Sequence, residues 1–434
     1  MSKSALLFPG QGSQYVGMGR ALAERYSAAR RTFEEAGDAL GWDVLRLCAE
    51  GDMAELTRTE NAQPAILTHS VAAYRAWTED ETAAPVEPAV CAGHSLGEFS
   101  ALACSGALGF ADAVRLVRAR GEFMQEAARR RPGGMAAVGG IGGERLEELL
   151  AQASDDRSVA VLAGINSPEQ RVVSGHRDAL LRLEKLLSGE RARFTFLNVG
   201  AAFHSPLMEE ASERFRERLE ACAFHVPRRP VLSGVTGQLH TGGRSEFIRL
   251  LALQLTQPVR WLDCMETMRD LGVGRAFELG PGRVLTRLWQ SFAPLTDARA
   301  SDDGLKENPH EAPRPSASVR PVPVSGQTSF LSRCLGIAAA TRNRGFADPE
   351  SYRIGVIEPY REVEALAREI ERKGASPTEE QLRRGWDMLL SQFETKRTDP
   401  DERRLRLSRL LEETGTSHLF EIRPDSVNQG GVAK

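Results

Sequence analysis

The segment Gly93-His94-Ser95-Leu96-Gly97 contains the serine that is best placed for nucleophilic chemistry in this chain. An apolar run at residues 88–92 precedes it, and a helix-like stretch at residues 98–103 follows. A serine between two glycines at a strand-to-helix turn is typical of a nucleophile elbow. The glycines permit the sharp turn, and the free amides of the helix N-terminus favour negative charge developing there. The pattern therefore predicts that Ser95 is a nucleophile.

A serine nucleophile needs a base, and the chain has 8 histidines. His94 is adjacent to Ser95, but neighbours on a tight turn point their side chains apart, so we expect His94 to support the elbow by packing or hydrogen bonding. His204 is the better candidate for the base. It lies in Ala202-Phe203-His204-Ser205-Pro206, a loop where the chain leaves an inserted domain and enters a helix. Loops on a rigid scaffold often carry catalytic groups.

The segments around Ser95 predict the scaffold that positions it. A first strand at residues 5–8 ends in Pro9-Gly10-Gln11-Gly12-Ser13-Gln14, whose glycines let backbone amides approach a ligand at the carboxyl edge of a sheet. The segment lacks the Lys-Ser/Thr ending of a phosphate loop. Helical patterns alternate with the strands, which predicts a mainly parallel sheet covered on both faces. These patterns lie at residues 20–40, 64–77, 110–129, 207–219, 247–255 and 261–271.

The pattern changes at residues 131–202, where strands and helices succeed one another as β-α-β-β-α-β. This order predicts a ferredoxin-like domain inserted into the larger α/β domain. The larger domain then comprises residues 1–130 and 203–295. The expected strands of the insertion lie at residues 135–141, 159–165, 170–174 and 193–197, and its helices at 144–152 and 177–187.

The C-terminal third has a different composition. Residues 296–328 are rich in proline, serine and charge, which predicts a flexible linker. Residues 329–420 show helical periodicity and are expected to form a helical extension of unknown role. Within it, Trp386, Leu389, Leu390 and Phe393 have the spacing of one apolar helix face.

Composition limits the classes of function. The chain of 434 residues is 41% hydrophobic and 26% charged, with a net charge of -3, so nothing favours binding to nucleic acid or to an anionic membrane surface. No apolar run approaches the roughly 20 residues that span a bilayer, and we see no signal peptide. The 6 scattered cysteines predict reduced thiols in a cytoplasmic protein and neither a disulfide framework nor a metal site.

Six spaced motifs resemble those of the malonyl-CoA:acyl carrier protein transacylases and the related polyketide-synthase acyltransferases. The resemblance covers about residues 4–293 and implies an α/β-hydrolase-like large domain with a ferredoxin-like insertion. The motifs are Gly10-Gln11-Gly12-Ser13-Gln14, Gly93-His94-Ser95-Leu96-Gly97-Glu98, Arg120-Gly121 with Met124-Gln125, Asn166-Ser167-Pro168-Glu169-Gln170, Ala202-Phe203-His204-Ser205, and Phe277-Glu278-Leu279-Gly280-Pro281-Gly282.

The resemblance implies roles for the residues around the nucleophile. Ser95 would attack the thioester, and His204 would accept its proton as general base. A main-chain carbonyl would orient the imidazole, and it maps to Gln254 or its neighbour. The backbone amides of Gln11 and Leu96 would form the oxyanion hole.

The resemblance also implies an acyl pocket. Arg120 would pair in two-pronged fashion with the free malonyl carboxylate, a geometry that lysine cannot copy. Met124 lies on the same helical pattern as Arg120. Phe203 and Leu96 match the malonyl-type pattern, in which a phenyl ring crowds a branched acyl group. Asn166 is either a polar contact near the acyl group or a turn residue before Pro168.

The expected function is transfer of malonyl from malonyl-CoA to the phosphopantetheine thiol of an acyl carrier protein by a ping-pong mechanism, in polyketide or fatty acid biosynthesis. No bound cofactor and no metal are expected; coenzyme A enters only as the thioester. Residues 296–434 lie beyond the part of the chain that resembles the family, and this additional segment favours a discrete, trans-acting acyltransferase of polyketide biosynthesis. Two alternatives are a proofreading hydrolase that strips acyl groups from carriers with the same Ser-His dyad, and a carrier-binding scaffold. Arg120 argues against the hydrolase, which needs no carboxylate clamp.

Overall fold

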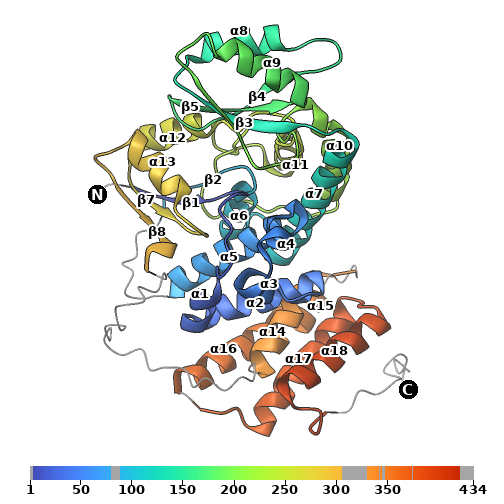
Figure 1. Cartoon of the computed structure of the whole chain (residues 1–434). Coiled ribbons are helices and arrows are strands. Elements are labelled where there is room, and N and C mark those ends of the chain that lie inside the picture. Colours follow the sequence, from blue (N-terminus) through green and yellow to red (C-terminus); the bar gives the residue numbers. More distant parts are fainter. Residues whose placement is uncertain are drawn as a thin grey trace. The chain divides into compact units, whose positions relative to one another are not determined.

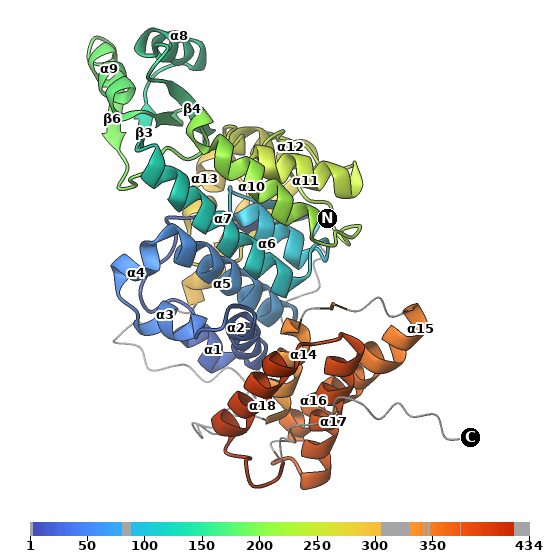
Figure 2. The same ribbon diagram turned by 90° about the vertical axis from the view of Figure 1, so that its right-hand side faces the viewer.

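The computed structural model describes residues 3–79, 88–304, 330–341, 343–344, 348–373 and 375–420. Its residues group into two compact units. The first unit comprises residues 1–36 and 42–306, and the second comprises residues 37–41 and 307–434. Figures 1 and 2 show the elements of both units from two directions.

A parallel four-stranded sheet lies at the centre of the first unit, with the strand order β2-β1-β7-β8. Its strands are β1 (Lys3–Phe8), β2 (Val90–Gly93), β7 (Val273–Glu278) and β8 (Asp297–Ala300). Five of the six β1 residues are buried, as expected for a parallel strand covered on both faces. Phe8 is paired with Gly93, and Leu7 with Glu278. The loops that follow β1, β2 and β7 therefore leave the sheet at one edge.

Helices surround this sheet, and α5 packs against both α6 and α7. The helices of this unit outside the small second sheet are α1 (Arg20–Arg25), α2 (Ser27–Leu40), α3 (Val44–Glu50), α4 (Met53–Thr57), α5 (Thr59–Glu79), α6 (Gly97–Cys104), α7 (Phe110–Arg130), the 3-10 turn η1 (Pro206–Met208), α10 (Glu209–Glu220), α11 (Gly243–Leu253), α12 (Trp261–Asp270) and α13 (Val284–Phe292). The single helical pattern expected at residues 20–40 is broken at Tyr26, whose backbone is extended at φ -124°.

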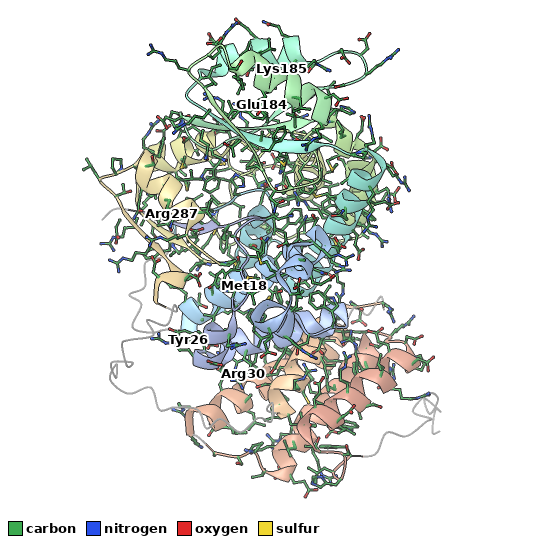
Figure 3. The ribbon with its side chains drawn as sticks, in the orientation of Figure 1. Met18, Tyr26, Arg30, Glu184, Lys185 and Arg287 are labelled. Carbon is green, nitrogen blue, oxygen red and sulfur yellow. The ribbon has the colours of Figure 1, made fainter. Side chains whose placement is uncertain are left out.

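A second sheet is antiparallel and has the strand order β4-β5-β3-β6. Its elements are β3 (Gly134–Gly139), α8 (Gly143–Ala153), β4 (Ala160–Ile165), β5 (Gln170–Gly175), α9 (Arg177–Leu187) and β6 (Arg193–Phe196). Figure 1 shows α8 and α9 side by side on this sheet. Leu180 and Leu183 of α9 are fully buried in the core, whereas Glu184 and Lys185, labelled in Figure 3, are exposed. The alternation is that of an amphipathic helix covering one face of a sheet.

The linker expected at residues 296–328 is wrong at its beginning. Residues 297–300 form β8, which pairs with β7, and Ser301–Gly304 form the 3-10 helix η2. Asp302 is 2% exposed, and its buried carboxylate accepts hydrogen bonds from the Tyr15 hydroxyl at 2.8 Å and the Gly282 N–H at 2.9 Å. These contacts attach the segment to the loops after β1 and β7. Residues 305–328 lie outside the described part of the chain.

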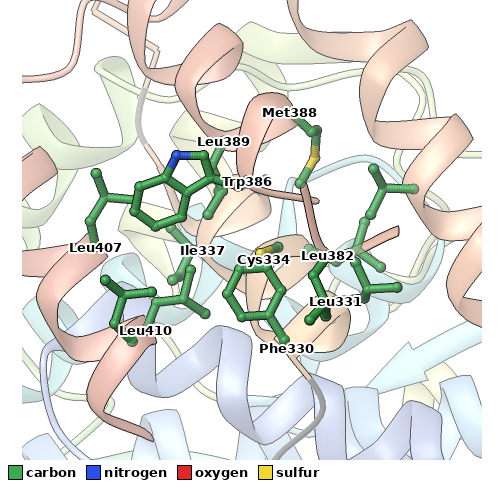
Figure 4. Close-up of a cluster of buried hydrophobic side chains, with 14 of the residues drawn as sticks. Phe330, Leu331, Cys334, Ile337, Leu382, Trp386, Met388, Leu389, Leu407 and Leu410 are labelled. Atoms are coloured by element: carbon green, nitrogen blue, oxygen red, sulfur yellow. The ribbon is translucent and has the colours of Figure 1, made fainter. Parts of the chain in front are cut away.

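The second unit contains the expected helices. They are α14 (Phe330–Ala340), α15 (Pro349–Tyr352), the π-helix η3 (Arg353–Ile357), α16 (Glu358–Lys373), α17 (Glu379–Thr395) and α18 (Pro400–Thr414). Figure 4 shows their shared apolar core. Trp386, Leu389 and Phe393 are buried in it, but Leu390 is 39% exposed, so its assignment to that face is wrong. The buried stripe of α17 instead continues backward to Leu382. No helix among the described residues combines the length and the apolarity needed to cross a membrane.

Candidate active site

The turn between β2 and α6 holds Ser95 in a strained conformation. Its φ of 51° is in the left-handed region, which costs a non-glycine residue about 1–3 kcal/mol and is found mainly at functional sites. Both flanking glycines are required by space. A Cβ on Gly93 would lie 2.0 Å from the Gly97 carbonyl carbon, and one on Gly97 would lie 1.9 Å from the Phe8 carbonyl oxygen. The predicted strand, sharp turn and helix are therefore all present around the serine.

His204 lies against the hydroxyl of this serine. Its Nε2 is 2.9 Å from Ser95 Oγ, and its Nδ1 is 2.7 Å from the main-chain oxygen of Gln254. Because a carbonyl can only accept, Nδ1 carries the hydrogen, and Nε2 is left to accept from the serine hydroxyl. His204 also has a left-handed φ of 55°. A serine, an imidazole and a group that orients the imidazole form the geometry of an activated nucleophile.

Burial favours the neutral form of this imidazole. It lowers the pKa of His204 to about 3, and the nearby Arg120 cation acts in the same direction. At neutral pH the imidazole is therefore unprotonated and able to accept a proton.

This pKa shift predicts how stability depends on pH. An unfolded histidine has a pKa near 6.5. Between about pH 3 and pH 6.5, His204 is therefore protonated in the unfolded chain but neutral in the folded chain. The contribution of His204 is complete above pH 6.5 and is lost as the pH falls. We expect His204→Asn to reduce the slope of unfolding free energy against pH by up to about 1.4 kcal/mol per unit between pH 4 and 6. Urea unfolding at several pH values measures this slope, and equal slopes for both proteins would contradict the shift.

Arg120 of α7 is 1% exposed and points at the same serine. Its Nη2 donates to Ser95 Oγ at 3.2 Å and to Gln254 Oε1 at 2.9 Å, and its Nη1 donates to Gln63 Oε1 at 2.9 Å. The Phe99 ring packs 5.7 Å from the guanidinium carbon. Burial lowers the pKa of Arg120 to about 10, so it stays a cation at neutral pH. Within the described residues no carboxylate forms an ion pair with Arg120, so the site suits an anionic ligand.

The two amides expected to form an oxyanion hole lie on adjoining loops. Leu96 is the N-cap residue of α6, and Gln11 follows β1. Among the described residues, no acceptor is hydrogen-bonded to the main-chain N–H of either residue. The two loops approach so closely that a Cβ on Gly10 would lie 2.5 Å from the His94 carbonyl oxygen. Two free N–H donors beside a nucleophile are able to stabilise an oxyanion.

The remaining predicted residues surround this centre. Asn166 Oδ1 is 2.9 Å from His94 Nε2, so Asn166 contacts the histidine of the elbow and not Ser95. The His94 ring also packs against Trp261 at 5.7 Å between centroids, in agreement with a supporting role. Met124 Sδ accepts from Gln63 Nε2 at 3.5 Å, and Phe203 is 8% exposed beside His204.

Sequence reasoning missed three residues of the site. Gln63 holds Arg120, and the buried pair Glu98–His240 lies behind the elbow, with 2.8 Å between carboxylate and imidazole. Gln63 was overlooked because the expected helix began at Pro64, whereas α5 begins at Thr59. Polar residues within an otherwise apolar helix would have been the signal. Among the described residues, no group of three histidine, cysteine or acidic side chains is placed to hold a metal ion.

A serine with a neutral imidazole, two backbone donors and a buried guanidinium defines an acyl-transfer site for an acyl group that carries negative charge. Residues 5–288 match the acyl transferase domain family. A malonyl CoA-acyl carrier protein transacylase of Bacillus subtilis is 43% identical over 288 residues, which is 66% of this chain and 71% of that protein. The chain belongs to the acyl transferase domain family, as a member of its malonyl-CoA:acyl carrier protein transacylases.

Solved structures show the same relationship. A crystal structure of an acyl carrier protein S-malonyltransferase from Vibrio cholerae superposes with a TM-score of 0.66 at 38% identity, covering 70% of this chain and all of that one. A type II PKS malonyl-transacylase, solved in complex with its acyl-carrier protein, has a TM-score of 0.65 at 36% identity and covers 69% of this chain and 95% of that one.

Proposed function

We propose that this protein transfers malonyl from malonyl-CoA, through an ester on Ser95, to the phosphopantetheine thiol of an acyl carrier protein. The observation that carries the proposal is the buried Arg120 cation, whose Nη2 is 3.2 Å from the Ser95 hydroxyl. An acyl group bound to that serine, with a carboxylate at its far end, would supply the anion that Arg120 lacks. The names of the relatives, and the related complex with a carrier protein, support this substrate and this partner.

The first half-reaction forms the ester. Ser95 Oγ bonds to the thioester carbonyl carbon while its proton passes to His204 Nε2, and the carbonyl oxygen becomes an oxyanion that the Gln11 and Leu96 amides stabilise. The C–S bond then breaks, and the proton on His204 passes to the departing CoA sulfur. The Gln254 carbonyl holds the imidazole in the required tautomer throughout.

The second half-reaction repeats these steps with another thiol. His204 removes the proton of the phosphopantetheine thiol, the sulfur attacks the ester, and Ser95 Oγ takes the proton back. A hydrolase would use water here and would need no cation at the acyl end, so the buried Arg120 favours transfer. No metal or bound cofactor takes part in these steps.

The finer description of the fold is part of the proposal. We describe residues 1–130 with 203–304 as an α/β-hydrolase-like catalytic domain and residues 131–202 as a ferredoxin-like insertion. The strand order β4-β5-β3-β6 with two helices supports the insertion, and the elbow supports the hydrolase-like domain. The six scattered cysteines, which include no Cys-x-x-Cys pair, support a cytoplasmic location.

A transfer assay tests the proposal. The protein is incubated with malonyl-CoA and a carrier protein bearing phosphopantetheine, and intact masses are measured over time. We expect the carrier to gain one malonyl group faster than malonate appears in solution. Release of malonate without loading of any carrier would instead indicate the hydrolase.

A further inference from the structure

Glu98 of α6 carries its carboxylate at a place that no step of the proposed reaction uses. The residue is fully buried, three positions after the nucleophile. Its Oε1 accepts from His240 Nε2 at 2.8 Å, and its Oε2 accepts from the Gly234 N–H at 3.0 Å and from Gln254 Nε2 at 2.7 Å. The side chains of Glu98 and His240 are 1% and 0% exposed. A buried carboxylate with this many donors is held in one orientation.

Gln254 connects this carboxylate to the reacting groups. Its side-chain amide nitrogen donates to Glu98 and to the Ser95 main-chain oxygen at 3.1 Å, and its amide oxygen accepts from Arg120 at 2.9 Å. Its main-chain oxygen accepts from His204. Because a carboxylate can only accept and a guanidinium can only donate, only one orientation of the Gln254 amide satisfies both neighbours.

The amide between Glu98 and Arg120 has a consequence for binding. A carboxylate in direct contact with Arg120 would occupy donors that a malonyl carboxylate needs. In this structure the Gln254 amide lies between Glu98 and Arg120, so the direct contacts of Arg120 are all neutral. The negative charge of Glu98 still raises the pKa of Arg120 and so favours the charged guanidinium.

We infer that Glu98 is a positioning residue that sets the specificity for charged acyl groups by holding the Gln254 amide, and through it the Arg120 guanidinium. The inference rests on the proposed malonyl transfer. Malonyl and acetyl groups should respond differently to the loss of Glu98, because an acetyl group has no carboxylate to pair with Arg120. The loss of Glu98 should therefore impair malonyl loading much more than acetyl loading.

The test measures kcat/KM for acyl-enzyme formation from malonyl-CoA and from acetyl-CoA. For Glu98→Ala we expect a fall of about 10- to 100-fold with malonyl-CoA and less than about threefold with acetyl-CoA. Glu98→Gln should stay within about threefold of the wild type, since its amide oxygen accepts the same two donors and the His240 ring can change tautomer. Equal losses with both substrates, or a glutamine variant as poor as the alanine variant, would overturn the inference.

Two further variants complete the design. Ser100→Ala is the matched control, because Ser100 is fully buried on the same helix and its hydroxyl has no partner among the described residues; both rates should be unchanged. In the Gln254→Ala background, Glu98→Ala should have a much smaller effect, because Glu98 holds Arg120 mainly through that amide. Additive losses would contradict this. A wild type that loads neither acyl group would refute the proposed function itself, which is a separate outcome.

Discussion

Ser95→Ala should abolish the malonyl adduct and lower the rate of carrier loading by about 10⁴- to 10⁶-fold. The acyl group bonds to Ser95 Oγ, and an alanine side chain offers His204 no hydroxyl from which to take a proton. Initial rates of malonyl-carrier formation, followed by intact mass, measure the loss. The protein should remain folded, because the left-handed backbone at position 95 strains alanine about as much as serine.

Ser100→Ala is the control for this variant. Its hydroxyl is buried without a partner among the described residues, so its removal tests only the loss of a serine hydroxyl from α6, the helix that follows the elbow. Full activity of Ser100→Ala beside an inactive Ser95→Ala supports the assignment. Residual loading by Ser95→Ala within about tenfold of the wild type would show that another group carries the acyl chain.

Arg120→Ala should change which acyl group the enzyme accepts. Removal of one partner of a buried ion pair costs about 3–5 kcal/mol, which corresponds to a fall of roughly 10²- to 4 × 10³-fold in kcat/KM for malonyl-CoA. Acetyl-CoA, which has no carboxylate, should lose little, so the preference for malonyl should disappear. Arg120→Lys should recover only part of the loss, because an ammonium cannot reproduce the planar two-pronged contact. Competition between the two thioesters gives the preference directly.

Arg118→Ala is the matched control for Arg120. Arg118 lies on the same helix, but its side chain contacts Glu122 and Asn61 instead of Ser95. We expect the malonyl preference to be kept in this variant. A preference for malonyl that survives in Arg120→Ala would refute the clamp.

Local patterns predicted the elbow, the base and the alternation of strands with helices. The glycines around Ser95 and the loop containing His204 can be recognised because the chemistry requires those residue types at adjacent positions. The succession of short strands and helices in residues 131–202 could also be predicted, because the amphipathic pattern of each element is local.

Contacts between distant segments were beyond reach. His240 meets Glu98 across 142 positions, and nothing near either residue indicates the other. Gln63 could not be predicted for a different reason. Proline favours the first turn of a helix, so the expected helix began at Pro64, whereas α5 begins at Thr59. The edge strand β8 (Asp297–Ala300) has no run of apolar residues, so its composition alone predicts a linker. The apolar face expected on α17 included Leu390, but the buried stripe of that helix is narrower and leaves Leu390 exposed.

The most direct test of the account is to locate the acyl group on the protein. The enzyme is mixed with malonyl-CoA, quenched in acid, digested, and the modified peptide is sequenced by tandem mass spectrometry. We predict one malonyl group, attached to Ser95 in the wild type and much less abundant when Arg120 is alanine. A malonyl group on any other residue, or none on Ser95, would contradict the account.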